Sequence, residues 1–171
     1  MNQNISMYSA SIPVFKQLLF ALSAILDKAQ AHTKEQDISP DHLLQASLYP
    51  DMFNFIRQVQ IAADFAKGIS ARLAGMEVPS YEDNESTVVE LKARIDKTLQ
   101  FISSIKPEQM QGSEQKEIIL RPGTPKERVL DGHSYLLSYG LPQFFFHVTT
   151  AYDILRNQGV NIGKKDFMGM Y

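Results

Sequence analysis

The sequence predicts an all-α protein, a four-helix bundle with a short β-like excursion before its last helix. Three stretches repeat apolar residues at spacings of three and four, which places those residues on one face of an amphipathic helix. A fourth, aromatic-rich stretch follows a segment that is rich in Pro and Gly. The chain has 171 residues, a length that suits a single domain, 1–171, around one core.

The first long helix is expected over residues 13–32. Pro13 stands near its start, where the missing N–H costs nothing. Ser39-Pro40-Asp41 then has the form of an N-cap followed by proline, which predicts a short helix or turn. The apolar stripe of the long helix has seven members: Phe15, Leu18, Leu19, Leu22, Ile25, Leu26 and Ala29.

The second long helix is expected to begin at Pro50-Asp51 and to end at Gly75, a typical C-terminal cap. Its apolar positions alternate steps of three and four, as in a helix that packs at a shallow angle in a bundle. These positions are Met52, Phe55, Val59, Ala62, Ala66, Ile69 and Leu73.

The third long helix is expected after Ser86, a residue type that caps helix N-termini, with Glu90 favourably placed near the positive end of the helix. Pro107 marks the exit from this helix. The same three–four rhythm runs through Val88, Leu91, Ile95, Thr98, Ile102 and Ile105.

Residues 108–131 break the helical rhythm. Two short apolar runs flank the sequence RPGTPKE, which predicts a β-hairpin or an irregular flap between the third and fourth helices. A two-stranded sheet is only marginally stable alone, so the hairpin is expected to rest on the helices.

The last long helix is expected after Asp131-Gly132, with Gly159 at its end. Pro142 lies inside it, removes one backbone donor and predicts a kink. The tail carries Phe167, Met168 and Tyr171, apolar side chains that are expected to dock on the bundle or on a partner. The helix itself holds the apolar residues Leu136, Leu137, Leu141, Phe144, Phe145, Val148, Ala151, Ile154 and Leu155.

Composition excludes several classes of function. The net charge is −2 and the pI is about 6.1, so there is no basic excess to neutralise nucleic-acid phosphates. The absence of cysteine excludes disulfides, thiolate nucleophiles and cysteine-ligated metals. No stretch approaches the roughly 18 apolar residues of a membrane span. The N-terminus lacks the charge pattern of a signal peptide. We therefore expect a cytoplasmic protein without nucleic-acid or membrane partners.

Four segments carry a family resemblance: SMYSASIPVF, PDMFNFIRQVQIAADFAKGISARLAG, FFFHVTTAYDILRNQGV and IGKKDF. With them the chain resembles, over almost its whole length, an uncharacterised bacterial family of the DinB-like superfamily. This superfamily also includes the YfiT-like candidate metal-dependent hydrolases. The resemblance implies an up-down-down-up bundle and pairing as a homodimer.

The resemblance also implies a metal site. Several superfamily members hold a divalent metal through three histidines, one on the second helix and two spaced by four on the fourth, and some are thiol-dependent transferases or isomerases. Carried over to this chain, His147 and Gln143 fall at the two fourth-helix positions and Gln60 near the second-helix position. Two of the three imidazoles are therefore missing, and carboxamides are weak ligands for transition metals.

Each candidate side chain has a functional and a structural interpretation. His147 is a ligand-binding group, a metal ligand or a general base, or else a buried neutral imidazole with a hydrogen-bond partner. Gln60 and Gln143 orient a bound molecule, or tie the second and fourth helices together. Asp64 fixes the tautomer of His147, or pairs with Lys67 one turn away.

Three hypotheses for function follow. We favour a bundle that binds a small molecule in a polar pocket between the second and fourth long helices, near His147, Gln143, Gln60 and Asp64, with the metal triad degenerate and no cofactor. The alternative is a metal-dependent enzyme, a thiol-dependent transferase or a hydrolase, that uses His147 with a divalent metal such as nickel or zinc. A second alternative is a dimeric interaction module. The sequence leaves open whether the protein is an enzyme.

Overall fold

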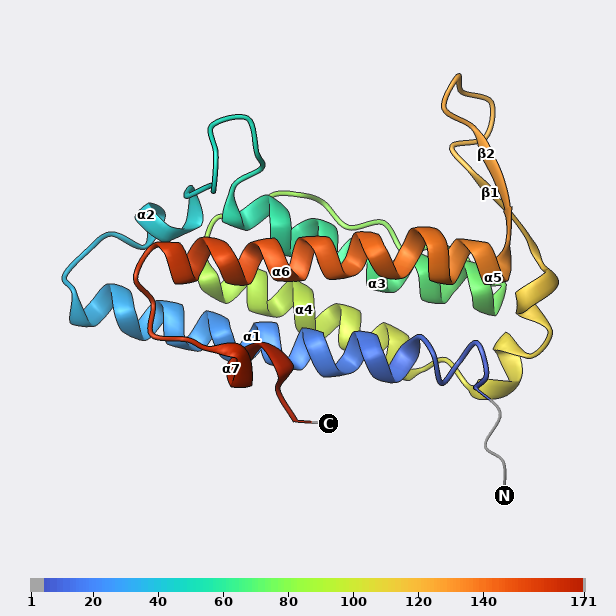
Figure 1. Ribbon diagram of the computed structural model, residues 1–171, viewed down its shortest axis with the longest axis horizontal. Coiled ribbons are helices and arrows are strands. Elements are labelled where there is room, and N and C mark those ends of the chain that lie inside the picture. Colours follow the sequence, from blue (N-terminus) through green and yellow to red (C-terminus); the bar gives the residue numbers. More distant parts are fainter. Residues whose placement is uncertain (1–4, 171) are drawn as a thin grey trace.

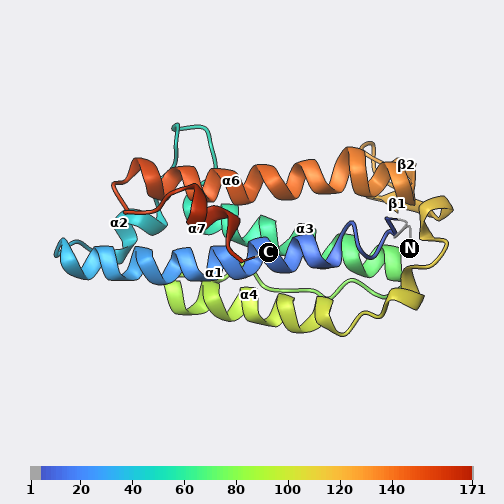
Figure 2. The same ribbon diagram turned by 60° about the horizontal axis from the view of Figure 1, so that its bottom comes forward.

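The computed structural model describes residues 5–170 and is mostly helical. Its four long helices are α1 (Ile12–Glu35), α3 (Phe55–Ala74), α4 (Val88–Ser103) and α6 (Leu141–Asn157). They lie side by side along the long axis of the molecule (Figures 1 and 2). The predicted helical fold with a small excursion before the last long helix is confirmed.

Shorter elements join the long helices. A two-stranded antiparallel sheet is formed by β1 (Glu117–Leu120) and β2 (Arg128–Asp131). Two 3-10 turns, Pro107–Met110 and Ser113–Gln115, precede it. The remaining elements are α2 (Pro40–Leu44), α5 (Gly132–Ser134), a π-helical turn (Tyr135–Gly140) and α7 (Lys164–Met168).

The core is built from the predicted stripes. All seven apolar positions of α1 are buried, as are the six positions of the third stripe, Ile105 just beyond α4 included. The stripe of α3 is buried from Phe55 to Leu73, whereas Met52 is only half-buried. Burial of such a contiguous apolar set is the main force that holds the helices together.

Two predicted helix starts were wrong. The second long helix begins at Phe55 rather than at Pro50-Asp51, because the side chain of Asn54 accepts a hydrogen bond from the Arg57 N–H at 3.0 Å and caps the helix there. The third is capped by Thr87 rather than Ser86. Thr87 and Glu90 form a reciprocal capping box, which satisfies two backbone donors at once.

The hairpin projects beside one end of the long helices (Figure 1). Its register pairs Ile118 with Leu130 and Ile119 with Val129. Alternation places Ile118 and Leu120 in the core and leaves Ile119 and Val129 exposed. Gly132 follows β2 at a point where a Cβ atom would lie 1.8 Å from the carbonyl oxygen of Ser113, so only glycine fits there.

The last helical run, residues 132–157, consists of α5, the π-helical turn and α6. It departs from α-helical geometry just before Pro142, the residue at which a kink was predicted. The N–H of Leu141 donates to the carbonyl of Leu136, five residues back, in the π-helical turn. Proline lacks an N–H and cannot continue the α-helical ladder, so a wider turn at this place accommodates it. Gly140, where a Cβ atom would lie 2.7 Å from Ile69 Cδ1, allows α3 to approach closely.

The tail docks on the long helices of its own chain, which was one of the two alternatives predicted for its apolar side chains. Gln17 Nε2 donates to the carbonyl of Met168 at 2.8 Å, and Lys28 pairs with Asp166 at 2.6 Å. The ring of Phe167 lies 5.6 Å from that of Tyr152. Tyr171 lies outside the described residues.

Among residues 5–170, no helix combines the length and the apolar character needed to cross a lipid bilayer.

Candidate functional site

His147 lies on α6 and is buried, with 8% of its surface exposed. Its Nδ1 lies 2.7 Å from Oε1 of Gln58 on α3. The Gln58 amide group is oriented by a second bond, because its Nε2 donates to the carbonyl of Phe53 at 3.2 Å. The oxygen of Gln58 therefore faces His147, and Nδ1 must carry the proton. This leaves the lone pair on Nε2.

The surroundings of His147 favour the neutral ring. The ring stacks on Phe65, with centroids 5.8 Å apart, and meets the edge of Phe146 at 5.2 Å. Burial, and then the positive charge of Arg57, lowers the pKa of His147 from 6.5 to about 4. Near neutral pH the ring is thus an uncharged donor to Gln58.

Gln58 was missed in the sequence interpretation, which placed Gln60 opposite His147. A signal was present. Gln58 follows Phe55 by three residues and precedes Ala62 by four, so it lies on the apolar stripe of its helix. A glutamine on such a stripe needs a buried partner, and a histidine in an aromatic helix is a suitable one.

Gln60 and Asp64 lie in a different environment, which we call the Arg94 cluster (Arg94, Asp64, Asp83, Glu85 and Gln60). The guanidinium of Arg94 pairs with the carboxylates of Asp64, Asp83 and Glu85 at 2.8, 2.9 and 2.9 Å. Gln60 Nε2 donates to Glu85 at 2.8 Å. The cluster ties α4 and α3 to the connection 75–87.

Cations and carboxylates balance in and around this cluster. Lys67 pairs with Asp64 at 2.8 Å, and Arg57 pairs with Asp83. Each carboxylate of the cluster thus has a cationic partner, and the ion pairs join three cations to three carboxylates. The ring of Tyr81 lies over the same charges, with the ammonium groups of Lys67 and Lys97 at 3.7 and 4.2 Å from its centroid. Such a neutralised network indicates a structural role for Asp64 and Gln60.

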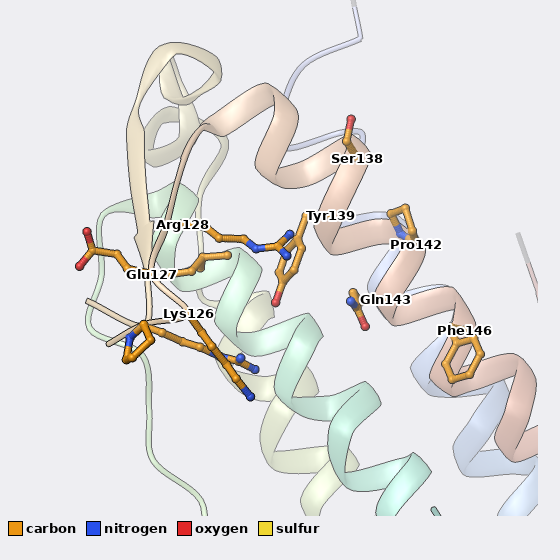
Figure 3. Close-up of a pocket in the computed structure, with 11 residues that line it drawn as sticks. Lys126, Glu127, Arg128, Ser138, Tyr139, Pro142, Gln143 and Phe146 are labelled. Carbon is orange, nitrogen blue, oxygen red and sulfur yellow. The ribbon is translucent and has the colours of Figure 1, made fainter. Parts of the chain in front are cut away.

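Gln143 lies at a third place, in a cleft of about 830 Å³ between the hairpin and the last helical run (Figure 3). The hairpin side contributes Leu120, Arg121, Pro125, Lys126, Glu127 and Arg128, and the helical side contributes Ser138, Tyr139, Pro142, Gln143 and Phe146. We call this space the hairpin cleft. In Figure 3, Arg128 extends from the hairpin toward Tyr139, and Gln143 follows one turn further along the helix.

A smaller hollow of about 170 Å³ adjoins the hairpin cleft and shares Leu120, Arg121 and Tyr139 with it. Its floor comes from α3 and includes Phe65, the residue on which His147 stacks. Phe65 also meets the Tyr139 ring edge-on at 6.0 Å. The four predicted site residues therefore fall at three places. Gln143 lines the cleft and Asp64 lines the adjoining hollow, whereas His147 borders that hollow only through its contact with Phe65.

Comparison with known families matches residues 7–168 to a domain of unknown function, DUF1993. The chain belongs to this family. Among solved structures, the DUF1993 chain is similar to a DinB family member from Shewanella denitrificans, with a TM-score of 0.90 and 37% identity. The match covers 96% of this chain and 92% of that one. The resemblance to an uncharacterised DinB-like family is thereby confirmed. No curated protein matches the chain.

The side chains of this DUF1993 protein do not fit the metal site that the superfamily implies. Within residues 5–170, no three His, Cys, Asp or Glu side chains lie close enough to share an ion. His147 offers one nitrogen, Nε2, and its neighbour Gln58 already uses its carboxamide in two hydrogen bonds. Late transition metals need several imidazole or carboxylate donors, and His147 with Gln58 does not provide them.

Proposed function

We propose that this protein binds a small molecule in the hairpin cleft, with Tyr139 and Gln143 as hydrogen-bonding groups. One observation carries the proposal. Tyr139 and Gln143 line the cleft and are half-buried, yet neither side chain makes a hydrogen bond within the part of the chain that the structure describes. The polar atoms of both side chains are open to solvent rather than buried, so a molecule that enters the cleft would find a hydroxyl and a carboxamide free to form hydrogen bonds.

The dimensions and lining of the cleft support the same proposal. Its volume of about 830 Å³ lies within the usual range for small-molecule sites, roughly 300–1,000 Å³. Pro142 and Phe146 provide an apolar wall, while Tyr139 and Gln143 provide a few polar groups. His147 acts on the site indirectly, because it holds the ring of Phe65 in the adjoining floor.

A mixture of neutral, cationic and anionic fragments, added to ¹⁵N-labelled protein, tests the proposal. We expect amide shift changes to concentrate in residues 120–128 and 138–146, which surround the cleft. Tyr139→Phe or Gln143→Leu should weaken the best fragment by roughly three- to tenfold, the effect of one neutral hydrogen bond.

Tyr152→Phe is the matched control, since Tyr152 lies further along the same helix and packs on Phe167. It should leave fragment affinity unchanged. Shift changes that map elsewhere, or the absence of any binding fragment, would refute the proposed site.

We also propose that the four long helices form an up-down-down-up bundle. The connection 75–87 supports this direction for α3 and α4. Its thirteen residues (75 to 87) can span about 40 Å when extended, whereas the 20 residues of α3 extend over about 30 Å. The chain can therefore return to the end of the bundle at which α3 begins.

The other functions considered have less support. For a metal-dependent reaction at His147, residues 5–170 supply no set of three His, Cys, Asp or Glu side chains that could hold the ion. The homodimer stays a prediction. Leu137 and Phe145 are exposed on the last helical run and could meet a second copy, but exposed apolar side chains are common on monomers.

A further inference from the structure

We propose that the ligand of the hairpin cleft is a small organic anion, its carboxylate or phosphate held by Arg121 and Arg128 and its apolar part lying against Phe146. This inference rests on the proposed function and adds the chemical class of the ligand. Three features support it: the cations that line the cleft, the backbone conformation of Arg121, and the position of Phe146 on the wall opposite the arginines.

The cleft concentrates cations that have no partner. Arg121, Lys126 and Arg128 line it, and none of them forms an ion pair with a residue in the range 5–170. Five of the fourteen other Lys and Arg side chains of the same range, Arg94 among them, form ion pairs, so the cleft is distinguished by three unpaired cations that line one cavity. In a chain of net charge −2, three free cations around one cavity form a local positive field that attracts anions.

The one carboxylate in the lining does not neutralise this field. Glu127 accepts a hydrogen bond from the backbone N–H of Gly123 at 2.6 Å, within the hairpin turn. Figure 3 shows its carboxylate pointing away from the helical wall, while Arg128 extends toward Tyr139. The guanidinium of Arg128 is therefore directed into the cleft and Glu127 out of it.

Arg121 has a strained backbone. Its φ of 51° lies in the left-handed region, which a long unbranched side chain seldom occupies. The other non-glycine residue with positive φ among the described residues is Asp37, a type that tolerates this conformation. Strain of this kind gathers at binding sites. Here it positions a residue that borders both the hairpin cleft and the adjoining hollow.

The opposite wall suits the uncharged part of the ligand. Phe146 is 55% exposed and lies on the helical wall, across the cleft from Arg121 and Arg128. A planar or apolar group stacked on this ring would remove it from water. Arginine forks bind carboxylates and phosphates through two parallel hydrogen bonds, so the two walls together select an anion that carries an apolar group.

Titrations followed by NMR test the inference with five probes: phenyl phosphate, benzoate, inorganic phosphate, phenol and benzylamine. We expect phenyl phosphate and benzoate to bind at least about tenfold more tightly than phenol or benzylamine, because charged hydrogen bonds contribute more than neutral ones. Phenyl phosphate should also bind more tightly than inorganic phosphate, which lacks the ring. The ranking of phenyl phosphate and benzoate identifies the preferred anionic group.

Two variants address the assigned residues. Arg121→Gln and Arg128→Gln should each weaken phenyl phosphate roughly tenfold to a hundredfold and leave phenol binding unchanged. Lys165→Gln removes the same charge from α7, away from the cleft, and should have no effect. Thermal unfolding of all three variants confirms that each is folded.

The outcomes separate the two proposals. If phenol and benzylamine shift the cleft residues as strongly as the anions do, the anionic class is wrong while the binding site stands. If none of the five probes shifts these residues, both proposals fail. If the Lys165→Gln control weakens phenyl phosphate as much as the arginine variants, the overall charge rather than the cleft accounts for binding.

Discussion

Replacing Arg94 with methionine is expected to lower the free energy of unfolding by about 3 kcal/mol. The guanidinium side chain is 1% exposed and pairs with three carboxylates. Removing it leaves Asp64, Asp83 and Glu85 facing one another without their shared cation. Loss of one partner of a buried pair typically costs 3–5 kcal/mol, roughly. The lower end applies because Asp64 and Asp83 are 37% and 40% exposed and regain water.

The change should also release the connection 75–87. Besides its ion pairs, Arg94 donates to the carbonyl of Glu82 at 3.0 Å and thereby holds this segment to α4. Urea denaturation measures the loss of stability, and amide hydrogen exchange of residues 76–87 measures the release.

Lys92→Met is the matched control on the same helix. Lys92 pairs with Asp27 at the surface, where the two side chains are 29% and 59% exposed. An exposed pair contributes at most about 1 kcal/mol. Equal losses for the two methionine variants would show that the Arg94 cluster stabilises no more than a surface pair does.

The second large effect is a loss of stability in acid that depends on His147. Burial, with the charge of Arg57, holds the pKa of this histidine at about 4 in the folded protein, against 6.5 for an ordinary histidine. Between these values the unfolded chain binds a proton and the folded chain does not. Stability is therefore fully present above pH 6.5 and declines as the pH falls toward 4, by about 3 kcal/mol at most.

His147→Asn isolates this contribution. The asparagine amide can still donate to Gln58, and it does not titrate. Because the other histidines remain, the difference between wild type and variant reports His147 alone. We expect denaturation midpoints of the wild type to fall faster with acid than those of the variant. Parallel curves would mean that His147 keeps an ordinary pKa and is not buried as described.

The apolar stripes explain why the helices could be predicted from the sequence. Phe15, Val59 and Ile95 each lie on a stripe of apolar residues spaced by three and four. This spacing can be read within a short stretch of sequence, and it identifies the face of the helix that is buried. Helix starts were less certain. The helices are capped by Asn54 and Thr87, not at the predicted Pro50 and Ser86. Capping depends on side-chain geometry, which the residue type alone does not determine.

The site was harder to predict because its parts come from distant segments. His147 was found, but its partner Gln58 lies two positions from the residue that the family motif indicated. Arg121 and Arg128 were passed over, since a hairpin in sequence does not reveal which helix it faces. The cleft exists only because the hairpin stands beside the last helical run.

The position of phenyl phosphate in the bound state tests the central claim most directly. We predict that isotope-filtered NMR spectra will show contacts between the ring protons of phenyl phosphate and the side chains of Phe146 and Pro142, in the hairpin cleft. Contacts to Phe65 and His147 without any to Phe146 would place the molecule between α3 and α6 instead, and would contradict the account.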